Sequence, residues 1–159
     1  MIYLEKDLED LIFTASDEEL ESRGFDINGT RLRQVNLGSY GICDILTYSV
    51  CKKSKEIDIT IYELKKNNLD YQTLMQAVRY SKGVKHFFQS RKSLFKVNIK
   101  IVLVGAKADA LVYFLPDVFE CVSVILYDFN ITGVLFKNIS GYGYSATNLP
   151  KKLKFAKNG

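Results

Sequence analysis

The chain has 159 residues, of which 47% are hydrophobic and 25% charged, and its formal net charge is +4. This length suits one domain with a proper core, and the composition is average for a soluble globular protein. The longest apolar runs fall far short of the ~20 residues needed to span a bilayer. The acidic start lacks the basic and apolar regions of a signal peptide. We therefore expect a cytoplasmic protein with no membrane partner.

The cysteine and histidine content narrows the chemistry. The three cysteines are scattered, without a CxxC pair, at Cys43, Cys51 and Cys121. This argues against a disulfide framework and against a structural zinc site. His86 is the single histidine, so histidine-based metal clusters and Ser-His-Asp triads are close to excluded. Any metal must be held mainly by carboxylates, which favours a hard cation such as magnesium or manganese.

The charges are distributed unevenly along the chain. Residues 1–26 hold nine acids and two bases, a net charge of −7, whereas residues 27–159 hold nine acids and 20 bases, a net charge of +11. The basic remainder could attract a polyanion such as nucleic acid. A solvated lysine-rich surface is an equally good interpretation of this charge alone.

The predicted elements begin with two helices. A helical spacing links the apolar residues Leu4, Leu8, Leu11 and Ile12. This first helix is expected to end before Thr14. A short second helix is expected over residues 17–23, with Asp17 as its N-cap.

Three runs with strand character follow, at residues 29–37, 41–50 and 56–64. Short polar connections separate them, which favours an antiparallel meander. The next segment, residues 68–90, is predicted to be a helix. Its expected packing face consists of Leu74, Ala77, Val78 and Ser81.

The remaining pattern predicts a buried strand over 97–106, a helix over 109–119 that stops near Pro116, and strands over 121–129 and 133–139. The order α, β, β, β, α, β, α, β, β indicates an α/β protein, a three-layer sandwich with a central mixed β-sheet flanked by helices. We expect a single domain over 1–148 and a basic C-terminal tail over 149–159.

Two carboxylates and a lysine are predicted to converge at a strand end. In the third strand Glu63 and Lys65 follow Ile59 and Ile61 on one face. If the second strand points its apolar face to the same core, Asp44 lies beside Glu63. Adjacent carboxylates repel unless a cation bridges them, and a divalent ion would also act as a Lewis acid on a phosphoryl oxygen. An ordinary carboxylate–lysine bridge is the alternative.

The spacing of these residues resembles a nuclease motif. The pattern GICD-x18-ELK, with Gly41 and Asp44 as G-x-x-D, is similar to that of the PD-(D/E)xK superfamily, although Cys43 stands in place of proline. Gln76 and Tyr80 in the following helix resemble the Q-x-x-x-Y signature of its RecB and NucS branches. The chain is shorter than NucS proteins and has no room for their separate DNA-binding domain.

The resemblance implies a restriction-endonuclease-like fold and a magnesium- or manganese-dependent nuclease. It implies metal ligation by Asp44, Glu63 and the Leu64 carbonyl, and positioning of the attacking water by Lys65. Gln76 and Tyr80 would hold the nucleic-acid backbone or a metal-bound water. The first helix would supply a further metal-binding glutamate, Glu9, with Glu5 one turn earlier as the fallback.

Several residues near this motif could contact nucleic acid. Phosphate contacts are expected from Lys66, Lys82 and Lys85, although a solvated side chain is the simpler interpretation of each. A phosphate contact is also expected from Arg79, for which a surface salt bridge is an equally good interpretation. Tyr71 could stack on bases, but core packing is the simpler interpretation of this aromatic residue.

Three functions stay open at this point. The first is a metal-dependent deoxyribonuclease, for example in DNA repair or encoded by a phage. The second is a catalytically inactive nuclease-fold subunit that binds nucleic acid or assists assembly. The third is a dimeric junction resolvase or restriction-type endonuclease. The partner would be single-stranded, duplex or branched DNA, and the chain would act alone, as a homodimer or inside a larger complex.

Overall fold

The computed structural model describes residues 5–139. Six strands form the main sheet: β1 (Thr30–Asn36), β2 (Ile42–Cys51), β3 (Glu56–Leu64), β5 (Lys96–Gly105), β7 (Val122–Asn130) and β8 (Gly133–Asn138). A small second sheet pairs β4 (Asn68–Leu69) with β6 (Lys107–Ala108). The helices are α1 (Glu5–Thr14), α2 (Asp17–Ser22), α3 (Tyr71–Ser90), α4 (Ala110–Tyr113) and α5 (Leu115–Val118), and η1 (Gly38–Tyr40) is a 3-10 turn.

The main sheet is mixed, as predicted. Its strand order is β1-β2-β3-β5-β7-β8. The first three strands form the expected antiparallel meander. The β3–β5 and β5–β7 pairs are parallel, and β8 returns antiparallel to β7. The connections that make parallel pairing possible run through α3 and through α4 with α5.

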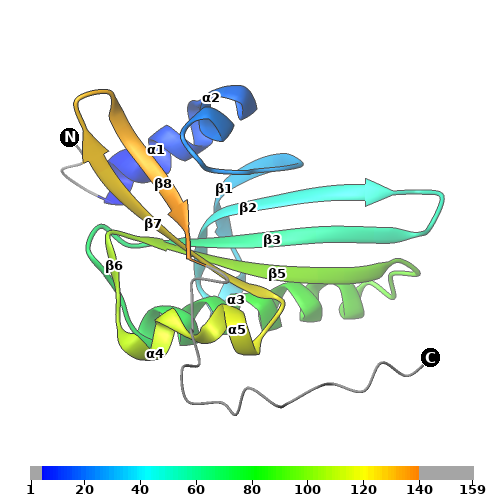
Figure 1. Ribbon diagram of the computed structural model, residues 1–159. Helices are drawn as coiled ribbons and strands as arrows, with labels where there is room; N and C mark the ends of the chain where they lie inside the picture. Colours follow the sequence, from blue (N-terminus) through cyan, green and yellow to red (C-terminus); the bar gives the residue numbers. More distant parts are fainter. Residues whose placement is uncertain (1–4, 140–159) are drawn as a thin grey trace, which may run out of the picture.

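Helices lie on both faces of the sheet (Figure 1). The α1 and α2 helices lie above it in this view, and α3, α4 and α5 lie below. Apolar side chains of α1, including Leu8 and Ile12, pack on a cluster that contains Ile45 and Leu64. On the α3 side, Tyr80 and Val84 pack with residues of β2 and β3. The chain is therefore an α/β protein with a central six-stranded mixed sheet.

The pattern of side chains explains why β3 is central. Its alternate residues Ile59 and Ile61 belong to the cluster on the α3 side, whereas Tyr62 and Leu64 belong to the cluster on the α1 side. Because helices cover both faces of the sheet here, the residues near the end of β3 are buried on both faces, and most of them are apolar. Glu63 interrupts this run, on the α3 side.

Several details differ from the sequence prediction. Residues 68–69, predicted to be helical, form β4, and α3 begins at Tyr71. Ser16, not Asp17, is the N-cap of α2, because its hydroxyl accepts the Glu19 N–H at 3.1 Å while Asp17 is already helical. Pro116 does not stop a helix; it lies in the first turn of α5, where its missing N–H costs nothing. Val78 is 42% exposed, and Tyr80 takes its place on the packing face.

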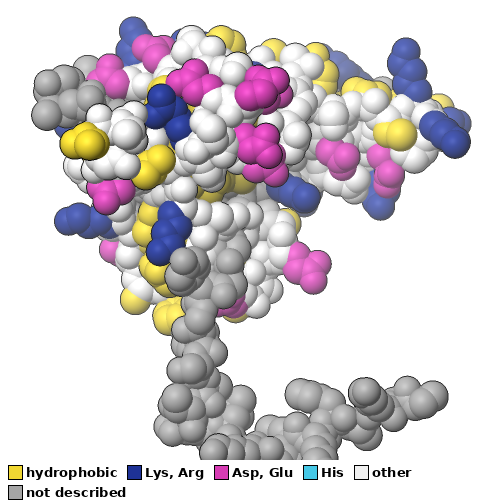
Figure 2. Space-filling model, turned by 45° about the horizontal axis from the view of Figure 1, so that its top comes forward, with side chains coloured by type: hydrophobic (Ala, Val, Ile, Leu, Met, Phe, Trp, Pro, Cys, Tyr) yellow, Lys and Arg dark blue, Asp and Glu magenta, His cyan; other side chains and the backbone are white. Residues whose placement is uncertain are grey.

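The view onto the α1–α2 side shows acidic side chains gathered over this part of the molecule and basic ones at the tip of the β2–β3 hairpin (Figure 2). None of the helices within residues 5–139 has the length and apolar character needed to cross a membrane. The predicted basic tail, 149–159, and the end of the predicted domain at residue 148 lie outside the described residues.

Candidate active site

Asp44 and Glu63 lie where the β2–β3 pairing ends. The last Cα partners in the register are Ile45 and Tyr62. Beyond this pair a side chain replaces the backbone carbonyl as acceptor. The Oδ2 atom of Asp44 accepts the backbone N–H of Leu64 at 3.0 Å. The side chain of Asp44 is thereby anchored to the residue next to Glu63.

Glu63 is an ionisable group in the core. It is 1% exposed, and Lys65 Nζ lies 2.9 Å from its Oε1. Its Oε2 is buried and accepts no hydrogen bond from any residue within 5–139. Burial, together with the negative charge of Asp44, raises the pKa of Glu63 to about 7 against the opposing effect of Lys65. A carboxyl in this position is poised between its neutral and charged forms at neutral pH.

The pKa values of Asp44 and Lys65, the two neighbours of Glu63, are shifted by burial and by the charges of this same group. Burial raises the pKa of Asp44, against the Leu64 N–H and the charge of Lys65, which lower it. Burial alone would lower the pKa of Lys65, but its hydrogen bond with Glu63 and the surrounding negative charges outweigh burial and raise it. Lys65 is therefore a fully charged ammonium, and it partly neutralises two acids.

This arrangement fits a divalent cation held by two carboxylates. The buried Glu63 Oε2 without a partner is the type of oxygen that a hard cation takes as a ligand. Within residues 5–139, no three carboxylate, thiol or imidazole side chains already stand together as a metal-binding group. The Lys65 ammonium lies against Oε1 instead. The predicted ligation by Asp44, Glu63 and the Leu64 carbonyl stays a prediction.

Side chains of β1 hold the carboxylate of Glu9. Its Oε1 accepts from Arg33 Nε at 2.8 Å, and its Oε2 accepts from Gln34 Nε2 at 2.7 Å. Gln34 has a φ of 49°, and the regular β1–β2 pairing skips it and Asp44. This kink aims the Gln34 amide at α1. Both Glu9 oxygens are therefore engaged.

Glu5, the fallback, acts on both central acids, although the charge of Glu9 acts more strongly on Asp44. It is exposed, and its Oε2 accepts the backbone N–H of Lys66 at 3.1 Å. Its negative charge raises the pKa of both Asp44 and Glu63. Of the two α1 glutamates, Glu5 is thus the one whose carboxylate lies beside the end of β3.

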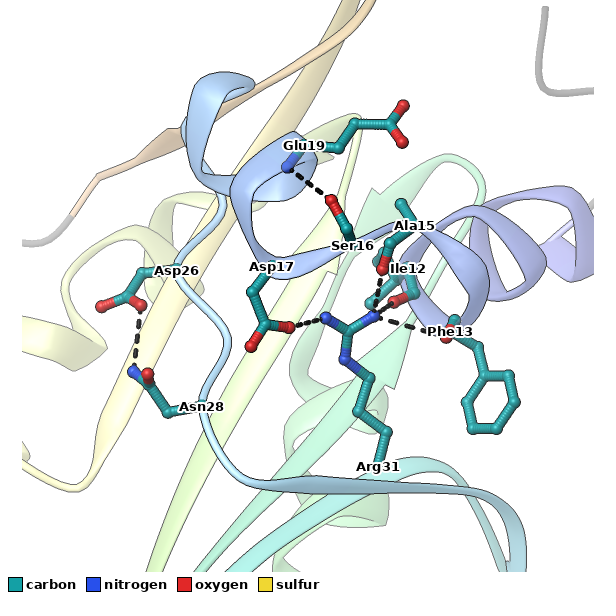
Figure 3. Close-up of polar contacts among 9 residues, drawn as sticks. All are labelled: Ile12, Phe13, Ala15, Ser16, Asp17, Glu19, Asp26, Asn28 and Arg31. Atoms are coloured by element: carbon teal, nitrogen blue, oxygen red, sulfur yellow. Dashed lines mark hydrogen bonds and ion pairs between the residues drawn. The ribbon is translucent and has the colours of Figure 1, made fainter.

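Arg31 of β1 fixes α1 in place (Figure 3). Its Nη1 donates to the carbonyl oxygens of Ile12, Phe13 and Ala15 at 2.9, 3.3 and 2.6 Å, and its Nη2 pairs with Asp17. The last carbonyls of a helix have no partner within the helix, and a cation there also complements the helix dipole. Arg31 therefore sets the position of α1 and of both its glutamates.

Gln76 and Tyr80 form a hydrogen-bonded pair on α3. Gln76 Nε2 donates to the Tyr80 hydroxyl at 2.6 Å. Tyr80 is 2% exposed and packs with Cys43, so Gln76 is the more accessible member. Burial raises the pKa of Tyr80, and the charges of Glu63 and Asp44 add to this effect. The structure thus brings this pair next to the two acids.

The position of the Tyr80 ring requires a glycine at residue 41. Its φ is +108°, and a Cβ placed on it would lie 2.9 Å from Cε1 of the Tyr80 ring. The glycine of the G-x-x-D pattern and the tyrosine of the Q-x-x-x-Y pattern are therefore in direct contact. This contact fixes the start of β2, three residues before Asp44.

The predicted nucleic-acid contacts lie in two places. Arg79, Lys82 and Lys85 are exposed on α3. Lys66 is half-buried after β3, and its carbonyl accepts from the Tyr127 hydroxyl. Tyr71 is 55% exposed at the start of α3, so the core-packing interpretation is wrong for this residue.

Sequence reasoning missed the residues that hold Glu9. Arg31 and Arg33 occupy alternate positions of an edge strand, and both are partly buried while their neighbours are exposed. Two arginines on one face, in a chain whose first 26 residues carry a net charge of −7, are a signal that this face meets the acidic segment. Gln34 has no such signal, because its role depends on the kink in β1.

A polar hollow of about 500 Å³ lies elsewhere on the sheet and contains none of the predicted site residues. Thr47, Thr60 and Lys100 are among its lining residues.

Comparisons with protein-family models, with curated proteins and with solved structures find no match for this chain. Its function is therefore inferred from its own residues and their geometry.

Proposed function

We propose that this protein is a metal-dependent nuclease that hydrolyses phosphodiester bonds of DNA, with a PD-(D/E)xK-type site and a restriction-endonuclease-like fold. One observation carries the proposal. The Glu63 carboxylate is 1% exposed, and its Oε2 has no hydrogen-bond partner within residues 5–139. A buried charge without a full set of partners is costly, so the placement of Glu63 beside Asp44 and Lys65 calls for a functional explanation.

In this proposal the site residues bind the metal and orient the attacking water. A bound magnesium or manganese ion would supply a Lewis acid and a source of metal-activated water. Asp44 and Glu63 would hold it with the Leu64 carbonyl. Lys65, 2.9 Å from Glu63 in the resting site, would leave that carboxylate, orient the attacking water and stabilise the developing negative charge.

Gln76 and Tyr80 suit a positioning role. Because the Tyr80 ring is locked in the core and its hydroxyl is held by Gln76 at 2.6 Å, the amide of Gln76 has a fixed orientation. A fixed amide at the edge of the site can hold a phosphate oxygen or an ordered water in register with the acids.

The test is cleavage of labelled single-stranded, duplex and branched DNA, and of RNA, in the presence of Mn²⁺. We expect cleavage of a DNA substrate that chelation abolishes and that Lys65→Ala reduces by at least about a hundredfold, as for loss of a general acid or base. A Lys96→Ala variant, which removes an exposed lysine at the other end of the sheet, is the matched control. No metal-dependent cleavage of any substrate by the wild type would contradict the proposal.

A second function is favoured by one observation. Both carboxylate oxygens of Glu9, the α1 glutamate predicted to bind metal, accept hydrogen bonds from Arg33 and Gln34. This is what a catalytically inactive nuclease-fold subunit, one that binds nucleic acid or assists assembly, would show. Such a subunit would bind DNA without cleaving it and would not require manganese, so the same assay with a parallel binding measurement separates the two functions.

A further inference from the structure

The outer surface of α3 has an unusual composition for a solvent-exposed helix face. Tyr71, Met75 and Val78 are 55%, 44% and 42% exposed. Together with Lys82 they follow the i, i+4, i+7, i+11 spacing of one helical stripe. Gln72, Gln76 and Arg79 form the adjacent stripe, and these seven residues line one shallow groove.

The charge of this helix favours an anionic partner. The 20 residues of α3 include Arg79, Lys82 and Lys85 and no aspartate or glutamate. A helix that pairs with a typical protein surface gains from charges of both signs, whereas a helix with bases alone complements a polyanion.

The groove borders the proposed active site. Gln76 lines it and donates to the hydroxyl of Tyr80, and the negative charges of Glu63 and Asp44 act on that hydroxyl. The Arg79 guanidinium also reaches to within 3.6 Å of the place where Gly41 would carry a Cβ. A polyanion bound along α3 would therefore enter the site at Gln76.

We propose that the Tyr71–Lys82 stripe of α3, with Arg79 beside it, binds single-stranded nucleic acid. Bases would pack on its apolar side chains, and Arg79 and Lys82 would hold phosphates. A duplex turns its base faces inward and presents phosphates and groove edges, so it cannot use Tyr71, Met75 and Val78. An unpaired strand offers base faces that stack on an exposed aromatic ring such as that of Tyr71 and pack against the apolar side chains next to it. At 1.5 Å per residue the stripe is about 16 Å long, which matches about five stacked nucleotides at about 3.4 Å each.

This inference rests on the proposed function for its location beside the site, but its test needs no catalysis. The measurement is fluorescence anisotropy, in the presence of EDTA, of the full chain with three probes: a labelled single-stranded oligonucleotide, the same sequence as a duplex, and an abasic strand of equal phosphate number. We expect tighter binding of the single strand than of either other probe.

The variants separate stacking from charge. Tyr71→Ala should lower affinity for the single strand at least about fivefold and leave the abasic strand unchanged, because it removes one stacking contact. Arg79→Gln should lower affinity for all three probes, since it removes a phosphate contact. Tyr48→Ala, which truncates another exposed tyrosine on β2, should change none of them. The Tyr71 side chain is exposed, so its removal should not unfold the protein.

The inference is overturned if the duplex binds as tightly as the single strand, if no probe binds, or if Tyr71→Ala has no larger effect than Tyr48→Ala. It is also overturned if α3 is covered by a second copy of the chain or a protein partner in solution. Failure of the proposed function appears differently, as Tyr71-dependent binding of the single strand without any metal-dependent cleavage. Cleavage of duplex DNA without Tyr71-dependent binding would reject the inference alone.

Discussion

At the scale of single residues, the burial of the Glu63 carboxyl carries an electrostatic cost for folding. Burial and the charge of Asp44 raise its pKa to about 7, and one ammonium, from Lys65, offsets that effect. A group whose pKa is higher in the folded than in the unfolded state stabilises the fold only while it is protonated. The fold therefore retains an acid that works against it at neutral pH.

This cost is measurable as a pH dependence of stability. The unfolded chain loses the Glu63 proton near the ordinary value of 4.5, while the folded chain keeps it up to about 7. Between these values the unfolded state binds fewer protons, so the free energy of unfolding falls as pH rises. Relative to Glu63→Gln, the wild type should lose on the order of 3 kcal/mol across this window. Urea unfolding at pH 4.5 and pH 8 measures the difference.

The control for this experiment is Glu56→Gln, the same substitution at the opposite end of β3, where Glu56 forms a longer ion pair with Lys96 at 3.4 Å. It should keep the pH dependence of the wild type. Parallel curves for the wild type and Glu63→Gln would show that the Glu63 carboxyl is not buried as described.

Gly41 gives a second prediction at this scale. Gly41→Ala would place a Cβ 2.9 Å from the Tyr80 ring at a φ of +108°. We expect a loss of about 2–4 kcal/mol in the free energy of unfolding, from overpacking added to backbone strain. Gly38→Ala is the matched control, because Gly38 also has a positive φ, +64°, but no heavy atom within 4 Å of an added Cβ. It should cost about 1 kcal/mol, and equal losses would refute the contact with Tyr80.

At the scale of elements, α1 depends on β1. Arg31 ties the last carbonyls of α1 to the edge strand, and Arg33 ties Glu9 to the same strand. Since α1 carries Glu5 and Glu9, the edge strand determines how an acidic helix approaches the sheet. Arg31 and Arg33 of β1 thereby form ion pairs with acids of the N-terminal segment.

Loss of this attachment should destabilise the fold. Arg31→Met keeps the length of the side chain and removes all its donors, so we expect a loss of about 2 kcal/mol in the free energy of unfolding. Lys96→Met, at an exposed lysine with a single long ion pair, should cost less than about 0.5 kcal/mol. Similar midpoints of chemical unfolding for both variants would contradict the role given to Arg31.

The elements themselves were largely predictable from the sequence. Strand character identified β1, β2 and β3, with clear alternation in β3, and their short connections identified the meander. The end of a helix is harder to predict, because Ser16 and Asp17 are both good caps and only the geometry of the turn selects Ser16. Pro116 was misjudged for a related reason: proline ends one helix and begins another with equal ease.

The site was predictable only in part. The convergence of Asp44 and Glu63 follows from strand alternation and hairpin pairing, which are local rules. The capture of Glu9 depends on Arg33 and on the kink at Gln34, which are long-range contacts without a sequence period. The exposure of Tyr71 depends on which side of α3 faces the sheet.

At the scale of the whole molecule, the two helical layers have different charge. The α1 and α2 helices bring the acidic segment, net −7 over residues 1–26, to one face of the sheet. The α3 helix brings only basic charges to the other. Glu63 lies at the carboxyl end of β3 on the α3 side, and Asp44 of β2 lies beside that strand end. This asymmetry gives a polyanion one favourable side from which to approach.

If Asp44 and Glu63 hold a divalent cation, as proposed, that cation should stabilise the whole fold. A ligand that binds only the folded state at a hundred times its dissociation constant adds about 2.7 kcal/mol to the free energy of unfolding. We expect saturating Mn²⁺ to raise the midpoint of thermal unfolding of the wild type at pH 8, and to leave that of Glu63→Gln unchanged. An equal shift in both proteins would indicate binding elsewhere.

The most direct measurement of the central claim is calorimetric titration of Mn²⁺ into the wild type, Asp44→Asn, Glu63→Gln and the Glu56→Gln control. We expect saturable binding by the wild type and by the control, and a loss of at least about tenfold in affinity for the other two. The absence of binding by the wild type, or binding that survives in both Asp44→Asn and Glu63→Gln, would contradict the assignment of these two acids to a metal centre.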